Sequence, residues 1–221
     1  MTREIVAEGI GTALLLVAVV GSGIMAERLA GGNVAVALLA NSIATGGALI
    51  ALILMFGPFS GAHFNPVVTL AFAVKRSVPP LEAAAYILVQ CVGAVFGVWL
   101  AHVMFGLPIL QTSAHVRGTF GELIGEVVAT FGLVGLILTC SERNASAVPF
   151  GVAAYITAAY WFTSSTSFAN PAVTIARSLT NTFAGIAPAH VPGFITAELV
   201  GGAVAFVLFV WLLAPRSEAK R

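Results

Sequence analysis

The sequence contains no aspartate and few charged residues of any kind. Charged side chains make up 9% of its 221 residues, whereas a soluble globular domain carries about 25%. Without aspartate, a carboxylate site for Mg²⁺ or Ca²⁺ is not expected. The formal net charge of +1 also argues against nucleic acid as a partner, because that role calls for a strongly basic surface.

Cysteine and histidine are scarce as well. Cys91 and Cys140 are isolated in apolar surroundings, so we expect two buried thiols and no disulfide framework. No residue pattern resembles an activated nucleophile or a metal cluster, and the four histidines lack the spacing of metal ligands: His63, His102, His115 and His190. We therefore expect no enzymatic activity, no cofactor and no metal.

Long apolar runs dominate what is present. Hydrophobic residues make up 59% of the chain, and the mean hydropathy is +1.01. A helix needs roughly 20 apolar residues to cross the lipid bilayer. The runs therefore predict an all-α polytopic membrane protein with six transmembrane helices, at about 4–26, 34–56, 81–105, 119–140, 147–166 and 191–213.

One tripeptide occurs almost twice, as Asn65-Pro66-Val67 and Asn170-Pro171-Ala172. Asparagine caps helix N-termini, and proline suits the first turn. The motifs open short apolar pieces, 65–74 and 170–180, and we expect Gly57-Pro58 to separate the first from its preceding span. Ten residues extend about 15 Å, half of a ~30 Å hydrocarbon core. Two such half-helices, buried by their N-termini, point to a transport site.

The rest of the chain repeats around these motifs. Each half has two spans, a half-helix and a third span, so the second repeat (111–221) must be inverted relative to the first (1–110). Further residues match between the halves: Glu8 and Thr12 with Glu126 and Thr130, and Gln90 with Glu198. The predicted architecture is one transmembrane domain, an inverted 3+3 repeat of six helices plus two re-entrant half-helices.

Lysine and arginine predict the orientation, because positive residues favour the cytoplasmic side. With both termini inside, seven of the ten lie in the cytoplasm: Arg3, Lys75, Arg76, Arg143, Arg216, Lys220 and Arg221. The short loops and tails favour a bacterial plasma (inner) membrane.

At this point the chain resembles the aquaporin, or major intrinsic protein, family. The resemblance rests on 60–69 (SGAHFNPVVT) and 168–173 (FANPAV), and it extends over essentially the whole chain. It implies a homotetramer with one pore per subunit, through which water and small neutral solutes pass. Asn65 and Asn170 would face the pore as hydrogen-bond donors, and the half-helix N-termini would repel cations. The alternative is that both asparagines are only helix caps.

The resemblance also assigns supporting residues. In relatives, glutamates at the positions of Glu8 and Glu126 bond the backbone of the re-entrant loops, and we favour that role over proton relay. His63 is expected to support its loop, with a pH-sensitive role as the alternative.

The chain departs from the family where selectivity is set. Most relatives have arginine directly after the second motif, and this chain has Val173. Gap-free counting puts the other constriction positions at Thr45, Ala158 and Ser167, which are small and uncharged with no aromatic ring. The expectation is a wide filter that admits neutral solutes larger than water. The alternative is that neighbouring bulk refills the space, from Trp161, Phe162 or Phe168.

The residues around Val173 resemble a bacterial subgroup that is associated with arsenic-resistance operons and conducts arsenicals. Arsenous acid is neutral at pH 7 and polyol-like in shape. Arg177 lies four residues beyond Val173 on the same helix face, so we expect it to lend positive charge to the outer vestibule. The competing hypotheses are a secondary active transporter, a strict water channel with a compensated filter, and a structural membrane protein.

Overall fold

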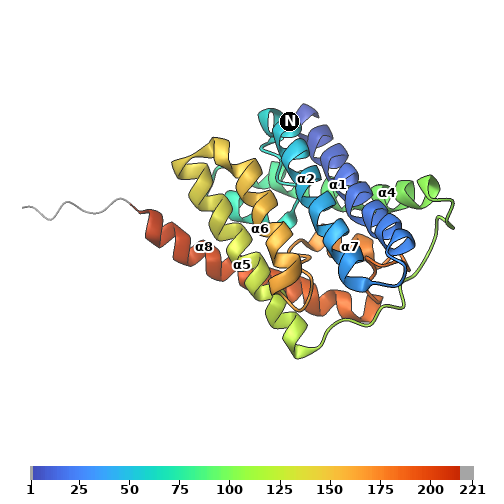
Figure 1. The fold of residues 1–221 in the computed structure, drawn as a ribbon. Helices are drawn as coiled ribbons and strands as arrows, with labels where there is room; N and C mark the ends of the chain where they lie inside the picture. Colours follow the sequence, from blue (N-terminus) through green and yellow to red (C-terminus); the bar gives the residue numbers. More distant parts are fainter. Residues whose placement is uncertain (1, 215–221) are drawn as a thin grey trace, which may run out of the picture.

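The computed structural model describes residues 2–214, which form eight α-helices and no strand. Two helices are short, α3 (Pro66–Val74) and α7 (Pro171–Arg177). The other six are long and apolar enough to cross a membrane, as predicted, with α6 counted together with the 3-10 turn Ala145–Ala147 that leads into it. They are α1 (Thr2–Leu29), α2 (Val34–Ser60), α4 (Pro80–Met104), α5 (Phe120–Arg143), α6 (Val148–Phe162) and α8 (Val191–Leu213) (Figure 1).

The helices pack in two similar groups. In the first half α1 packs against α2 and α4, and in the second half α5 packs against α6 and α8. Contact between α2 and α6 joins the halves. The long loop from α4 to α5 runs around the outside of the bundle (Figure 1). Each half thus has the same order of elements, and its short helix lies before its last long one.

Glycines allow matching helices to touch backbone to backbone. A Cβ atom on Gly93 of α4 would clash with the carbonyl oxygen of Gly9 in α1, and one on Gly201 of α8 would clash with that of Val127 in α5. Small residues at helix crossings are typical of membrane bundles, where close packing drives association.

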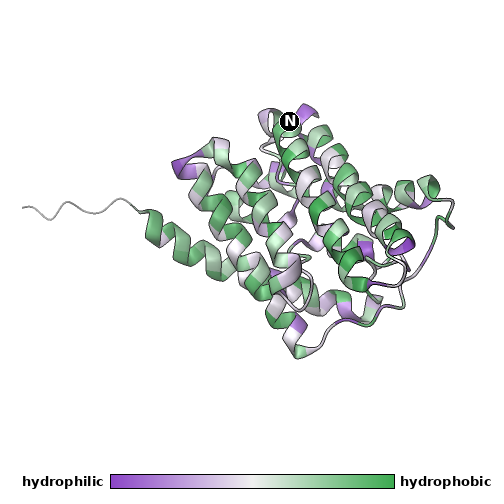
Figure 2. Ribbon diagram, viewed as in Figure 1, coloured by the Kyte–Doolittle hydropathy of each residue, from purple (hydrophilic) through white to green (hydrophobic). Residues whose placement is uncertain are grey.

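Apolar side chains cover the outside, and polar ones are enclosed. The long helices are coloured as hydrophobic over most of their length (Figure 2), and exposed residues on them include Leu88, Phe96 and Trp211. In contrast, Glu8 and Glu126 are fully buried. Such a distribution suits lipid as the surrounding solvent, since no water is available there to satisfy an exposed polar group.

Three predicted boundaries were wrong. α2 continues through Gly57-Pro58 and ends only at Ser60, where the following Gly61 closes the helix with a positive φ of 86°. Proline removes one backbone hydrogen bond, and this loss is tolerated in the last turn. α6 ends earlier than expected, at Phe162, because Thr163 has an extended backbone, and α7 ends earlier than expected, at Arg177.

One ion pair shows that two of the helix ends lie on the same side of the molecule. Lys75, just after α3, pairs with Glu142 near the end of α5, so these two ends lie on the same face of the molecule. Three of the cations used in the orientation argument lie outside the described residues: Arg216, Lys220 and Arg221.

Candidate functional site

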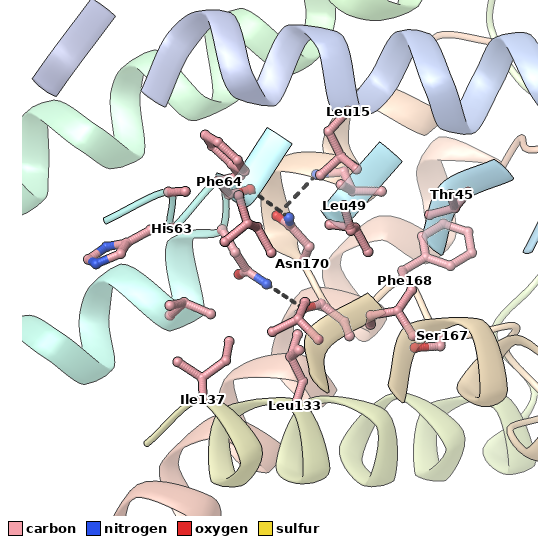
Figure 3. Close-up of a pocket in the computed structure, with 18 of the residues that line it drawn as sticks. Leu15, Thr45, Leu49, His63, Phe64, Leu133, Ile137, Ser167, Phe168 and Asn170 are labelled. Atoms are coloured by element: carbon pink, nitrogen blue, oxygen red, sulfur yellow. Dashed lines mark hydrogen bonds between the residues drawn. The ribbon is translucent and has the colours of Figure 1, made fainter. Parts of the chain in front are cut away.

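The two Asn-Pro motifs meet tip to tip inside the bundle. Asn65 caps α3, since its Oδ1 accepts from the Val67 amide at 2.9 Å, and Asn170 caps α7 by accepting from the Ala172 amide at 3.0 Å. Each also reaches the other loop. Asn65 Nδ2 donates to the Ala169 carbonyl and Asn170 Nδ2 to the Phe64 carbonyl, both at 2.7 Å (Figure 3).

Both asparagines are therefore more than caps. A side-chain amide has two N–H donors, and one of them on each residue is used in the bond across the loops. The second is available to a molecule in the adjoining cavity, whose wall includes Asn65 and Asn170. The N-termini of α3 and α7 point to this place, and each carries positive partial charge.

The loops leading into the motifs have an unusual backbone that matches between the halves. We call residues 60–74 the first re-entrant segment and residues 163–177 the second. Ala62 and Phe64 have positive φ angles of 50° and 49°, and Ser167 and Ala169 have 52° and 49°. Positive φ at a residue other than glycine costs about 1–3 kcal/mol, so other interactions must hold each segment in place.

Buried glutamates supply these interactions. Glu8 accepts from the amides of His63 and Phe64 at 2.9 and 2.7 Å. Glu126 accepts from those of Phe168 and Ala169 at 2.9 and 2.7 Å. The contacts suit the predicted scaffolding role, because a carboxylate satisfies several backbone donors at once.

A cavity of about 100 Å³ adjoins the motifs. A water molecule needs roughly 10–15 Å³, so several fit. His63 lies at one end, Thr45 and Ser167 lie at the other, and Asn170 lies between them (Figure 3). Much of the wall is apolar, with Leu15, Leu49, Leu133 and Ile137 among its residues. A row of water or solute molecules would therefore find polar partners only at a few positions.

Three of the four predicted constriction residues line this cavity, and the fourth does not. Thr45, Ser167 and Val173 are in the wall and buried. The placement of Ala158 was wrong, because its side chain is exposed on the outside of the bundle. Tyr160 lines the cavity instead, and its hydroxyl lies 3.2 Å from Thr45 Oγ1. The expectation of a constriction without an aromatic ring was therefore wrong as well.

Helix periodicity explains the error. The residues of α6 that line the cavity are Val148, Val152, Ile156 and Tyr160. They are four residues apart and so share one face, whereas Ala158 is two residues from both Ile156 and Tyr160 and points away. This spacing is visible in the sequence, but which face of α6 lines the cavity depends on how the helix is rotated in the bundle.

Arg177, one turn beyond Val173, lies against Phe168 at the end of the cavity that holds Thr45 and Ser167, which the orientation predicted from lysine and arginine makes the outer end. Its side chain is in the cavity wall and only 3% exposed. The guanidinium carbon lies 3.4 Å from the centre of the Phe168 ring, and Nε donates to the Ala184 carbonyl. Within residues 2–214, Arg177 forms no ion pair. Its positive charge is thus held beside the cavity by an aromatic ring and a carbonyl group.

Of the bulky residues that could refill the constriction, only one faces the cavity. Phe168 is in the wall, whereas Trp161 and Phe162 are 48% and 54% exposed. Arg117 approaches the same ring from the loop before α5, 5.3 Å from its centre, and donates to the Gly185 carbonyl. Burial lowers the pKa of the Arg117 guanidinium below its ordinary value.

His63 marks the opposite end of the cavity. Its Nδ1 lies 3.1 Å from Thr69 Oγ1, and its ring stacks on Phe72 with centroids 4.9 Å apart. With its amide bound to Glu8, the residue is anchored at both backbone and side chain. These contacts fit the expected role in loop support.

Six membrane helices with two half-helices meeting at a narrow cavity define a transmembrane channel. The family model described as Major intrinsic protein matches residues 1–149. Aquaglyceroporin AqpS of Rhizobium meliloti (strain 1021) is 54% identical over 215 residues, which cover 97% of this chain and 92% of the relative. Aquaporin NIP2-1 of Oryza sativa subsp. japonica is 30% identical over 194 residues, 84% of this chain and 64% of that one.

The chain therefore belongs to the major intrinsic protein family. The X-ray structure of the aquaglyceroporin from Plasmodium falciparum has the same fold, with a TM-score of 0.75 over 97% of both chains at 19% identity. The protein is an integral membrane channel for water and small solutes such as glycerol, and it is not an enzyme.

Proposed function

We propose that this channel passes uncharged solutes larger than water, glycerol and arsenous acid among them, through an outer constriction without arginine. The observation that carries this proposal is Val173, whose short apolar side chain stands in the cavity wall in the first turn of α7. An arginine there would add both bulk and charge. The name of the Rhizobium relative, aquaglyceroporin, supports the same substrate class.

Hydroxyl groups around Val173 suit such solutes. The Thr45 and Tyr160 hydroxyls pair with one another at 3.2 Å, and each keeps further bonding capacity. Ser167 Oγ is buried and has no hydrogen-bond partner among residues 2–214. An unsatisfied buried hydroxyl costs about 1–3 kcal/mol, so a passing solute that bonds it is favoured. Glycerol and arsenous acid both present several hydroxyls to this site.

Charge selectivity comes from the centre and the outer end of the cavity. Asn65 and Asn170 offer donors to a solute oxygen, and the half-helix N-termini add positive potential. Arg177 contributes a further positive charge at the outer end, where relatives place an arginine closer to the motif. In this proposal cations are repelled, and neutral solutes pass downhill in either direction.

The remaining expectations concern assembly and membrane. We propose a homotetramer with one pore per subunit in a bacterial plasma (inner) membrane, both termini cytoplasmic, each subunit one domain of two inverted repeats, 1–110 and 111–221. A bacterial relative and the shared face of Lys75 and Glu142 support this arrangement.

Two other hypotheses predict different fluxes. A strict water channel is favoured by Tyr160 and Phe168, which bring rings to the constriction. A secondary active transporter is the other alternative, and its flux would saturate and respond to a protonophore.

The test is stopped-flow light scattering on proteoliposomes with water, glycerol and arsenous acid. Wild type should pass all three, unaffected by a protonophore. Val173→Arg should lower glycerol and arsenous acid permeability by about tenfold or more, the effect of a barrier raised by 1.4 kcal/mol, while water is affected less. Val173→Ile, which adds bulk but no charge, separates the two effects. Passage of water alone through wild type would contradict the proposal.

A further inference from the structure

The anchors of the two re-entrant segments differ at one position. In the first half, Gln90 of α4 donates from Nε2 to Glu8 at 2.7 Å and to Thr69 at 2.9 Å. The matching residue of α8 is Glu198. An amide donor in one half is thus replaced by a second carboxyl group in the other, beside Glu126.

Glu198 is fully enclosed next to the second Asn-Pro motif. Its Oε1 accepts from the Asn170 amide at 3.2 Å and from the Thr174 hydroxyl at 2.6 Å. Its Oε2 has no donor among the described residues. Glu126 lies beside it, because the two carboxyl groups bind the backbone amides of consecutive residues, Phe168 and Ala169 for Glu126 and Asn170 for Glu198. Neighbouring carboxyl groups repel each other when both are ionised. A single shared proton replaces this repulsion with a hydrogen bond.

The positive charges near these two carboxyl groups do not remove the need for a shared proton. Arg177 approaches from α7 and Arg117 from the loop before α5, and Tyr160 of α6 lies near the two arginines. Both arginines favour ionised carboxylates. Within residues 2–214, however, neither forms an ion pair with Glu126 or Glu198. The contact between the two carboxyl groups therefore still needs a donor.

We propose that Glu126 and Glu198 together bind one proton at neutral pH, with Glu198 Oε2–H donating to the Glu126 carboxylate. The protonated acid then does for the second segment what the Gln90 amide does for the first. Removal of the proton by hydroxide at alkaline pH leaves two repelling carboxylates behind Phe168, Ala169 and Asn170. This segment then loosens and flux falls, while the first segment, anchored by Gln90, is insensitive to the same change.

Infrared spectroscopy of the full-length protein in lipid tests the proton directly and does not depend on which solutes pass. The wild type at neutral pH should show the C=O stretching band of a buried protonated carboxylic acid. Glu198→Gln should remove this band, and alkaline titration of wild type should remove it as well. A wild-type spectrum without any such band at neutral pH would overturn the proposal, even if the variant does not fold.

Water permeability of proteoliposomes gives the functional consequence. Wild-type permeability should fall several-fold between neutral and alkaline pH, and Glu198→Gln should keep wild-type permeability at neutral pH and lose the alkaline decline. The reciprocal variant Gln90→Glu, which creates the same pair in the first half, should steepen the decline. A Glu198→Gln channel that folds but retains the alkaline decline, or that is inactive at neutral pH, would overturn the proposal. Neither result would alter the conclusion about solute size.

Discussion

The two re-entrant segments share their backbone conformation and the contacts that anchor it. They differ in the side chains that they place at the two ends of the cavity. Asn65 and Asn170 are 105 positions apart, and the same offset relates other pairs. Val68 matches Val173, and both line the cavity. The residues with positive φ match as well, Ala62 with Ser167 and Phe64 with Ala169, as do the amides bound by Glu8 and Glu126.

The same offset pairs residues of contrasting chemistry. His63 corresponds to Phe168, and Phe72 corresponds to Arg177. At the inner end the histidine ring stacks on a phenylalanine, and at the outer end an arginine covers a phenylalanine ring. The geometry of stacking is thus retained while the charge changes. One backbone design supports both ends, and a few side chains decide which end is cationic.

Replacing the buried glutamates that anchor the re-entrant segments should have the largest effect on stability. The loss should differ between the two segments. Glu8 accepts four hydrogen bonds, from Ser60 and Gln90 as well as from two amides. Each donor left unsatisfied costs about 1–3 kcal/mol. We expect Glu8→Ala to lower the stability by about 4 kcal/mol or more, and Glu126→Ala, which leaves fewer donors, by less.

Thermal unfolding followed by size-exclusion chromatography in detergent measures these losses. Glu27→Ala is the matched control, because Glu27 lies on the same helix as Glu8 and is exposed. Equal stability of Glu8→Ala and the control would show that the buried carboxylate is not an anchor.

A smaller effect is expected from the charge that distinguishes the outer end. Arg177→Met keeps a long apolar stem against Phe168 but removes the positive charge, whereas Arg177→Lys retains the charge. We expect cation leak through the first variant to rise by about tenfold, the result of lowering a barrier by 1.4 kcal/mol, and through the second to stay near wild type. Neutral solute flux should change little in either.

Potential-sensitive dye measurements on proteoliposomes report the leak. Phe72→Met, at the corresponding position of the first segment, is the control and should leave it unchanged. Cation exclusion that survives in Arg177→Met would assign charge selectivity to the half-helix N-termini alone.

Sequence reasoning predicted the spans and both half-helices, because each depends on a local signal, whereas the partners of the two glutamates were predicted from the family resemblance. Apolar runs determine the spans, and the Asn-Pro caps mark the short helices. The end of α2 was wrong for a local reason too: Gly57-Pro58 suggests a break, but Gly61 is the residue with the left-handed conformation that ends a helix.

The constriction could not be predicted in the same way, because it brings together residues from three separate elements. Counting along the chain located Ser167 and Val173, which lie within the second re-entrant segment. It failed for α6, since the position of a helix face depends on how the helix is rotated in the bundle. The proton between Glu126 and Glu198 needs contact between α5 and α8, and composition alone does not reveal it.

The smallest expected effect concerns the hydroxyl that reaches the outer end from α6. Tyr160→Phe removes the bond to Thr45, worth about 0.5–1.5 kcal/mol, and keeps the ring that narrows the constriction. Glycerol permeability should therefore change by less than about tenfold, whereas water permeability stays the same. Ala158→Val adds bulk at the residue that gap-free counting selected, and it should leave both fluxes unchanged because this side chain faces away from the cavity. A reduced glycerol flux in Ala158→Val, together with an unchanged flux in Tyr160→Phe, would show that α6 is rotated relative to the structure described. The polar groups at the outer end would then come from the second re-entrant segment and α2 alone.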